Sequence, residues 1–236
     1  MEPHPSYQEC RSYVAAHLHH QPQKPIGNTL APTSLTISRQ TGARGRTIGI
    51  KLKDKLRSLT PTSPIPWTLF DEDLVQQVLT EHQLPIDLEQ FMPDDGTSEI
   101  TASINELLGR HPSLWTLFEK TAATISRLAR IGHCIIVGRG GNEITQGFSN
   151  VIRVRLIGSM EQRLHQMTAV HGMSNTGAIK FIKEEDTARR RYIKQHFGAD
   201  IDASNRYDLV INTDKLSDET IVNLLATAIQ QHSKTV

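Results

Sequence analysis

One segment combines glycines, arginines and a hydroxyl in a spacing suited to binding phosphate. Gln40–Thr47 (QTGARGRT) lies on the phosphate-loop pattern GxxxxGK[ST], in which backbone N–H groups hold phosphates where a strand leads into a helix. Gly45 and Thr47 fit the pattern, whereas Gln40 replaces its first glycine and Arg46 replaces its lysine. Arg46 still supplies positive charge, and the Thr47 hydroxyl could hold Mg²⁺. An ordinary strand–turn–helix connection with surface arginines is the alternative. The residues of the predicted phosphate site are Gly42, Ala43, Arg44, Gly45, Arg46 and Thr47.

A second glycine-rich turn carries one arginine. Gly138–Gly141 (GRGG) follows an apolar run, and the Arg139 guanidinium suits a bidentate clamp on a phosphate or carboxylate. The alternative, a tight turn whose arginine faces solvent, is favoured when this segment is taken alone.

A charged helical segment is the third candidate. In Lys183–Lys194 (KEEDTARRRYIK), Asp186 and Arg189 are three residues apart and share one helix face. A helix that carries arginines could close over a triphosphate and stabilise the charge being transferred. A solvated, salt-bridged helix is the alternative and is favoured for this segment by itself.

The elements around these segments predict an α/β fold. Short apolar runs alternate with stretches of helical periodicity, which is the pattern of a parallel sheet covered on both faces. In such sheets ligands bind beyond the carboxyl ends of the strands, where all three candidate segments lie. The expected strands are 35–38, 67–70, 134–137, 151–157 and 209–212. Asp71 is expected to cap a helix that follows it, and residues 171–177 are expected to form a loop. Arg39 and Arg44 add local positive charge near the first glycine-rich segment.

Composition narrows the class of partner. Lys and Arg number 26 against 25 Asp and Glu, a balance that argues against a protein coating a nucleic acid polymer. No apolar stretch has the length needed to span a membrane, and the start of the chain lacks a secretory pattern. The two cysteines, Cys10 and Cys134, lie far apart, and the second is expected to be a buried thiol. These features predict a cytoplasmic protein.

The chain divides into an arm and a domain. Residues 1–34 are predicted to form an N-terminal arm that ends in a proline-rich linker. A docked or partly disordered arm is favoured, and an arm that mediates homo-oligomerisation is the alternative. Residues 35–236 are predicted to form the main domain, with an insertion at about 71–130 and a lid at about 171–200.

The order of these motifs resembles the cytidylate kinase-like group of P-loop nucleoside monophosphate kinases. The resemblance covers roughly residues 35–230. It rests on LTISRQTGARGR, FDEDLVQQVL, CIIVGRGGNEI, IRVRLIGSMEQRL, EEDTARRRY and YDLVINTDKLSDE.

The resemblance implies a P-loop NTPase fold, with a parallel five-stranded sheet flanked by helices and with NMP-binding-type and lid-type insertions. It also implies transfer of a phosphoryl group from ATP and Mg²⁺ to a nucleoside monophosphate. Gly42–Thr47 would match the ATP phosphate loop and Arg139 the clamp on the acceptor phosphate. In the lid, Asp186 would be a nucleotide contact and Arg189 a phosphate contact. Asn212-Thr213 would lie near the adenine.

Three positions depart from the family pattern. Arg46 stands where the family has Lys, Gly140 where it has Asp, and Ile182 where it has another lid arginine. The leading expectation is a phosphotransferase acting on a small-molecule nucleotide or similar acceptor, with Arg46, Arg139 and Arg189 as its catalytic residues. A nucleotide-binding protein of the same fold without kinase activity is the alternative.

Overall fold

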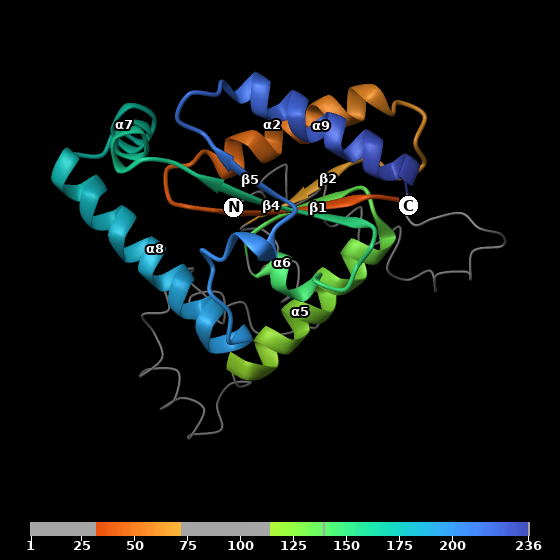
Figure 1. Cartoon of the computed structure of the whole chain (residues 1–236), viewed down its shortest axis with the longest axis horizontal. Helices are drawn as coiled ribbons and strands as arrows, with labels where there is room; N and C mark the ends of the chain where they lie inside the picture. Colours follow the sequence, from red (N-terminus) through yellow and green to blue (C-terminus); the bar gives the residue numbers. More distant parts are fainter. Residues whose placement is uncertain (1–31, 72–113, 139, 236) are drawn as a thin grey trace, which may run out of the picture.

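Five parallel strands form the centre of the structure (Figure 1). This computed structural model describes residues 32–71, 114–138 and 140–235. The strand order is β2-β3-β1-β4-β5, and every neighbouring pair is parallel. The carboxyl ends of all five strands therefore meet along one edge. The strands are β1 (Ser34–Arg39), β2 (Thr68–Phe70), β3 (Cys134–Val137), β4 (Val151–Ile157) and β5 (Leu209–Asn212).

Helices cover both faces of the sheet. In Figure 1, α2 and α9 pack side by side on one face, whereas α5 and α6 lie on the other. The hairpin formed by α7 and α8 stands at one side, and α8 runs from there toward α5. The helices are α2 (Gly45–Leu59), α5 (Leu114–Ile131), α6 (Gly141–Ile144), α7 (Met160–His171), α8 (Asn175–Phe197) and α9 (Asp218–Thr235).

The two faces of β1 differ in chemistry because successive side chains point to opposite sides of a sheet. Leu35 and Ile37 join the main apolar core with residues of α2 and α9. On the other face Ser34 donates to the Ala129 carbonyl of α5, and Thr36 packs on Gly141 of α6. The central strand thus has an apolar face under α2 and a polar face under α5 and α6.

Small residues let α2 lie close to the sheet. Gly45 and Gly49 are both buried, and a Cβ at Gly49 would stand 3.0 Å from a methyl of Leu69. A Cβ at Gly45 would stand 2.9 Å from the Cγ of Arg39. The first turn of α2 therefore lies directly over the end of β1.

The structure confirms the predicted parallel five-stranded fold. The runs 134–137, 151–157 and 209–212 form strands with the predicted bounds. Cys134 is buried, and burial raises the pKa of its thiol to about 12. None of the helices in the described ranges is long and apolar enough to cross a membrane.

Two local predictions were wrong. The expected loop at 171–177 is shorter, because the Ser174 hydroxyl caps α8 by accepting from the Gly177 N–H, so that the helix begins at Asn175. The four-residue helix α6 was not predicted, because it is too short to show a helical period. The expected helix after Asp71 and almost all of the predicted arm, residues 1–34, lie outside the described residues. The division into arm, insertion and lid stays a prediction.

Candidate phosphate-binding site

The connection between β1 and α2 forms a tight loop at the carboxyl edge of the sheet. The Gln40 N–H donates to the Leu156 carbonyl of β4 at 3.0 Å, and the Ala43 N–H donates to the Gln40 carbonyl at 3.1 Å. Gly42 and Arg44 both have positive φ, at 81° and 61°. The first turn of α2 contains no acidic residue, and no side chain caps it. Backbone N–H groups at such a helix start favour an anion.

Arg44 anchors this loop to the C-terminal part of the chain. Its guanidinium donates to the Asp218 carboxylate at 2.6 Å, the Thr213 carbonyl at 2.5 Å and the Leu216 carbonyl at 2.8 Å. The Arg44 side chain therefore points to the connection between β5 and α9, and only its backbone belongs to the turn at the start of α2.

Arg46 lies on the opposite side of the loop. Its Nε is 3.3 Å from a carboxylate oxygen of Asp71, the residue that follows β2. The Arg46 side chain is 45% exposed, whereas that of Asp71 is 12% exposed. Thr47 is half-buried in the first turn of α2. The structure thus brings a cation, a hydroxyl and a carboxylate to one end of α2. The sequence had suggested Asp71 only as a helix cap.

Arg39 crosses beneath the start of α2. The Arg39 side-chain carbons pack on Gly45. The Nη1 of Arg39 lies 2.5 Å from the position that a Cβ would take at Gly138. Gly138 has a φ of 83° and follows β3. The Arg39 side chain therefore extends from the loop after β1 to the glycine turn after β3, and it adds positive charge between these two loops. The sequence singled out Arg39 only as local charge.

The predicted pair on α8 does meet the loop. The Asp186 Oδ1 accepts from the N–H and the hydroxyl of Thr41, both at 2.8 Å. Arg189 donates from Nη1 to the Thr41 hydroxyl and from Nη2 to Glu185 at 2.7 Å. Arg163 of α7 completes the group, with its Nη1 at 2.5 Å from Asp186. Arg163 was not predicted, because its contact depends on how α7 packs on the loop.

The glycine turn after β3 packs under α8. Arg139, the predicted clamp, lies outside the described residues. Gly140 has a φ of 68°, and a Cβ there would stand 2.5 Å from the Phe197 ring. No larger residue fits this position without displacing that ring, which gives a physical reason for glycine where the family pattern has Asp. Phe197 belongs to an aromatic cluster between α5 and α8 that also contains Phe118, Tyr192 and His196.

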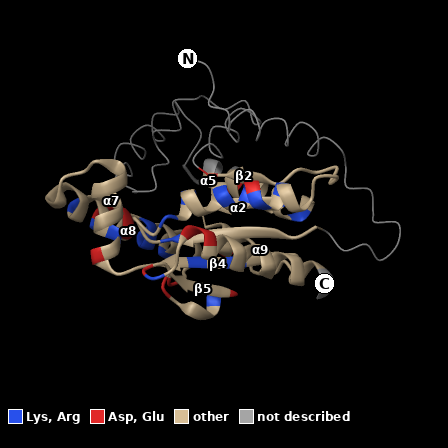
Figure 2. Cartoon of the chain, turned by 90° about the horizontal axis from the view of Figure 1, so that it is seen from above, with Lys and Arg blue, Asp and Glu red and all other residues tan. Residues whose placement is uncertain are grey.

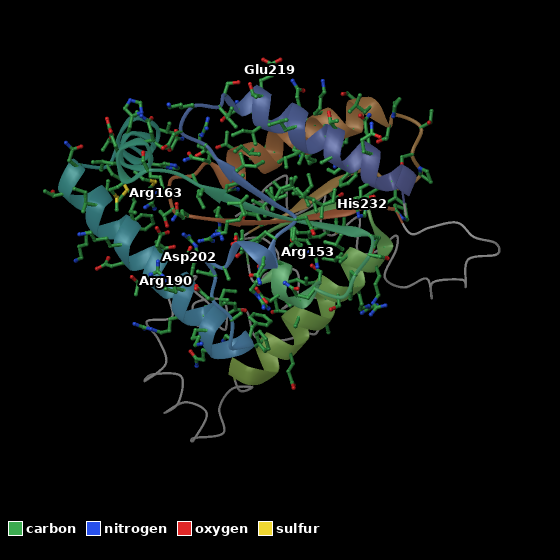
Figure 3. All side chains as sticks on the ribbon, viewed as in Figure 1. Arg153, Arg163, Arg190, Asp202, Glu219 and His232 are labelled. Carbon is green, nitrogen blue, oxygen red and sulfur yellow. The ribbon has the colours of Figure 1, made fainter. Side chains whose placement is uncertain are left out.

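A buried arginine occupies the polar face of the sheet beside this turn. Arg155 of β4 donates to the Ser38 hydroxyl at 2.8 Å and to Asp202 at 2.7 Å. Asp202 also accepts from Arg190 of α8 at 3.4 Å, as the labelled side chains in Figure 3 illustrate. Tyr207 lies beside them, and burial raises the pKa of its phenol above the ordinary value. These contacts fix the second half of α8 to the sheet.

Charges of both signs gather in this region. Figure 2 shows basic and acidic residues together where α7 and α8 meet the sheet. Within the described ranges, no three His, Cys, Asp or Glu residues come together as a metal-binding group. Besides the Asp186 carboxylate, which binds Thr41 and Arg163, the oxygen donors next to the loop include the Thr47 hydroxyl and the Asp71 carboxylate. They suit a cation held partly by a bound phosphate and less well a fully protein-coordinated metal.

Solved structures share this fold at low sequence identity. An uncharacterized protein from Eubacterium ventriosum superposes with a TM-score of 0.61 at 16% identity, covering 84% of this chain and 98% of that one. A gluconokinase from Sinorhizobium meliloti superposes with a TM-score of 0.48 at 11% identity, covering 87% of this chain and 95% of that one. A shikimate kinase from Bacteroides thetaiotaomicron superposes with a TM-score of 0.43 at 15% identity, covering 84% of this chain and 96% of that one. No curated protein matches the sequence.

The sequence model of the cytidylate kinase-like family matches residues 34–215, which contain all five strands, the β1–α2 loop and both helices of the α7–α8 hairpin. The match and the strand order agree with the resemblance drawn from the motifs. The chain belongs to the cytidylate kinase-like family and has an α/β fold with a parallel five-stranded sheet.

Proposed function

We propose that the protein is an ATP-dependent phosphotransferase that acts on a nucleoside monophosphate or a similar small acceptor. The observation that carries this proposal is the β1–α2 loop, an anion-suited turn that arginines approach from three directions. Arg39 comes from β1, Arg46 from α2 and Arg189 from α8. Phosphoryl transfer is catalysed mainly by positioning and by stabilising charge, and these groups suit that task. Membership of the family supports the same chemistry.

The residues divide into donor and acceptor groups. The backbone of Gly42–Thr47 holds the ATP phosphates, and Arg46 offsets their charge. Thr47 is the residue that would hold Mg²⁺, which when bound would neutralise the phosphate oxygens. Arg139 orients the acceptor, and Arg189 stabilises the transferring group from the α8 side.

The start of α2 suits an anion. The absence of acidic residues from the first turn of α2 keeps that end of the helix attractive to anions. Gly42 and Gly45 leave no room for a Cβ, because Arg163 packs against the first and Arg39 against the second, so both arginines lie close to the loop.

A coupled assay of ADP release over a panel of nucleoside monophosphates tests the proposal. We expect turnover with at least one acceptor and a loss of at least about 100-fold in kcat for Arg189→Met. Lys180→Ala, an exposed position on the same helix, is the matched control and should retain full activity. Absence of turnover with every acceptor would overturn the kinase proposal.

Two observations favour a second candidate, a nucleotide-binding protein without transfer. Arg46 is paired with Asp71, and the Phe197 ring excludes an Asp at position 140. This candidate predicts saturable binding of ATP or ADP by calorimetry with no product formed. In either case we propose a small nucleotide as the ligand, and neither a nucleic acid polymer nor a membrane as the partner. A cytoplasmic location and homo-oligomerisation through residues 1–34 are further proposals, drawn from the sequence.

A further inference from the structure

Both carboxylate oxygens of Asp186 are engaged by the protein. Oδ1 accepts the Thr41 N–H and the Thr41 hydroxyl, each at 2.8 Å, and Oδ2 accepts Nη1 of Arg163 at 2.5 Å. The Asp186 side chain is 16% exposed. A carboxylate with this many charge-assisted partners is a strong local constraint on the backbone that it binds.

Arg163 also binds the loop backbone directly. Nη1 of Arg163 also donates to the Thr41 carbonyl at 3.2 Å, and its Nε donates to the Gly158 carbonyl at 3.1 Å. A Cβ at Gly42 would stand 2.7 Å from the Arg163 backbone carbonyl. Thr41 is therefore bound through its N–H, its hydroxyl and its carbonyl, and Gly42 packs directly on α7.

The charges of this cluster balance. Arg163 is paired with Asp186, and Arg189 is paired with Glu185 at 2.7 Å. Two cations and two carboxylates thus surround Thr41. Of these, the Arg163–Asp186 pair is directed at the loop backbone, because Asp186 accepts the Thr41 N–H and Arg163 donates to the Thr41 carbonyl.

We infer that Asp186 is a positioning residue, which with Arg163 sets the conformation of the phosphate loop, and that it is not a nucleotide contact. The ligand part of this inference rests on the proposed function, in which Gly42–Thr47 binds phosphate. Asp186 then acts on phosphate affinity through Thr41 and Gly42. Because Asp186 lies on α8, the helix that carries Arg189 and the loop that holds the donor form one hydrogen-bonded unit.

Hydrogen exchange of the full-length protein without ligand tests the structural part. Asp186→Ala should raise exchange of the amides in residues 40–47 by about tenfold or more, because hydrogen bonds to charged groups are lost. Asp208→Ala is the matched control, since it also removes a carboxylate from an arginine, but at the β4–β5 edge. Exchange in 40–47 that is the same in Asp186→Ala and the wild type would overturn the inference. Thr41→Val loses only the hydrogen bonds of the Thr41 hydroxyl and should raise exchange in residues 40–47 by a smaller factor. This variant provides the test if Asp186→Ala does not fold.

Calorimetry with inorganic triphosphate and with ADP, each with Mg²⁺, tests the ligand part. A positioning role predicts that Asp186→Ala weakens both ligands by the same factor, about tenfold or more, because triphosphate has no sugar or base to contact. A loss confined to ADP would mean that Asp186 touches the nucleoside, which overturns the inference. If the wild-type protein bound neither ligand while exchange still rose in Asp186→Ala, the proposed function would fail and the role of Asp186 in shaping the loop would stand.

Discussion

Arg44 and Asp218 join the start of α2 to the start of α9 through a hydrogen-bonded ion pair of 2.6 Å. Lys51 binds the other oxygen of the same carboxylate, also at 2.6 Å. Two arginines that lie close together in the sequence therefore have different roles. The Arg44 side chain serves packing between the two helices, whereas Arg46, two residues later, is exposed beside the turn.

We expect Arg44→Ala to destabilise the fold and Arg46→Ala to leave it nearly unchanged. Removal of Arg44 leaves the Asp218 carboxylate and the Thr213 and Leu216 carbonyls without this donor, at a cost of about 2 kcal/mol. The pair made by Arg46 is exposed and should contribute less than about 1 kcal/mol. Urea unfolding of both variants measures the difference, and equal losses of stability would contradict the assignment.

Arg46 should instead determine nucleotide affinity. Arg46→Ala is expected to weaken binding of ADP and Mg²⁺ by about tenfold or more, because a cation beside the phosphates is lost. Arg46→Lys should retain most of the affinity, since the position keeps its charge. Calorimetry provides the measurement, with Lys180→Ala as the control for an exposed cation on another helix. An unchanged ADP affinity in Arg46→Ala would remove Arg46 from the site.

Gly42→Ala should cost more than substitution of another left-handed glycine. Gly42 combines a φ of 81° with backbone atoms of Arg163 in the space that a Cβ needs, so strain and overlap together should cost about 2–4 kcal/mol. Gly198 has a similar φ of 64° but open space around it, and Gly198→Ala should cost about 1 kcal/mol. Thermal and urea unfolding of the two variants separate the steric part from the conformational part. Equal costs would show that α7 does not press on the loop.

The buried carboxylate of Glu143 should make Arg206 important for stability. The Glu143 side chain is only 2% exposed, and Arg206 binds both of its oxygens. Arg206→Leu would leave a buried charge without its cation, and we expect a loss of about 3 kcal/mol in the free energy of unfolding. Glu184→Ala, which removes an exposed pair with Lys180, is the comparison and should cost less than about 0.5 kcal/mol.

Asp208 should make the fold less stable in acid. Burial alone would raise the pKa of this carboxyl, but hydrogen bonds from the Arg153 side chain and backbone outweigh it, so the folded-state pKa lies below its ordinary value. The stabilisation is complete above the unfolded-state pKa of about 3.9 and is lost as the pH falls through the lowered folded-state pKa. Unfolding measured from pH 7 down to pH 2.5 should show the difference between wild type and Asp208→Asn shrinking below about pH 4. A difference that does not change with pH would contradict this origin.

Sequence periodicity predicted the sheet because its strands are short apolar runs bounded by glycine and polar residues. It also placed Asp186 and Arg189 on one helix face and the glycine-rich loop at a strand end. It could not show that the Asp186 carboxylate binds Thr41, because spacing within one helix carries no information about the opposite element. For the same reason Arg163, whose contact is with the backbone of a distant loop, has no sequence signal in a single chain.

The partners of the phosphate loop also bear on how the protein folds. Thr41 is bound by a residue 145 positions later in the chain, and Arg44 by one 174 positions later. Contacts of such long sequence separation are slow to form, because closing the long intervening loop costs chain entropy. During synthesis the loop therefore leaves the ribosome long before the residues that shape it, and we expect it to become competent for phosphate only when α8 and α9 have docked.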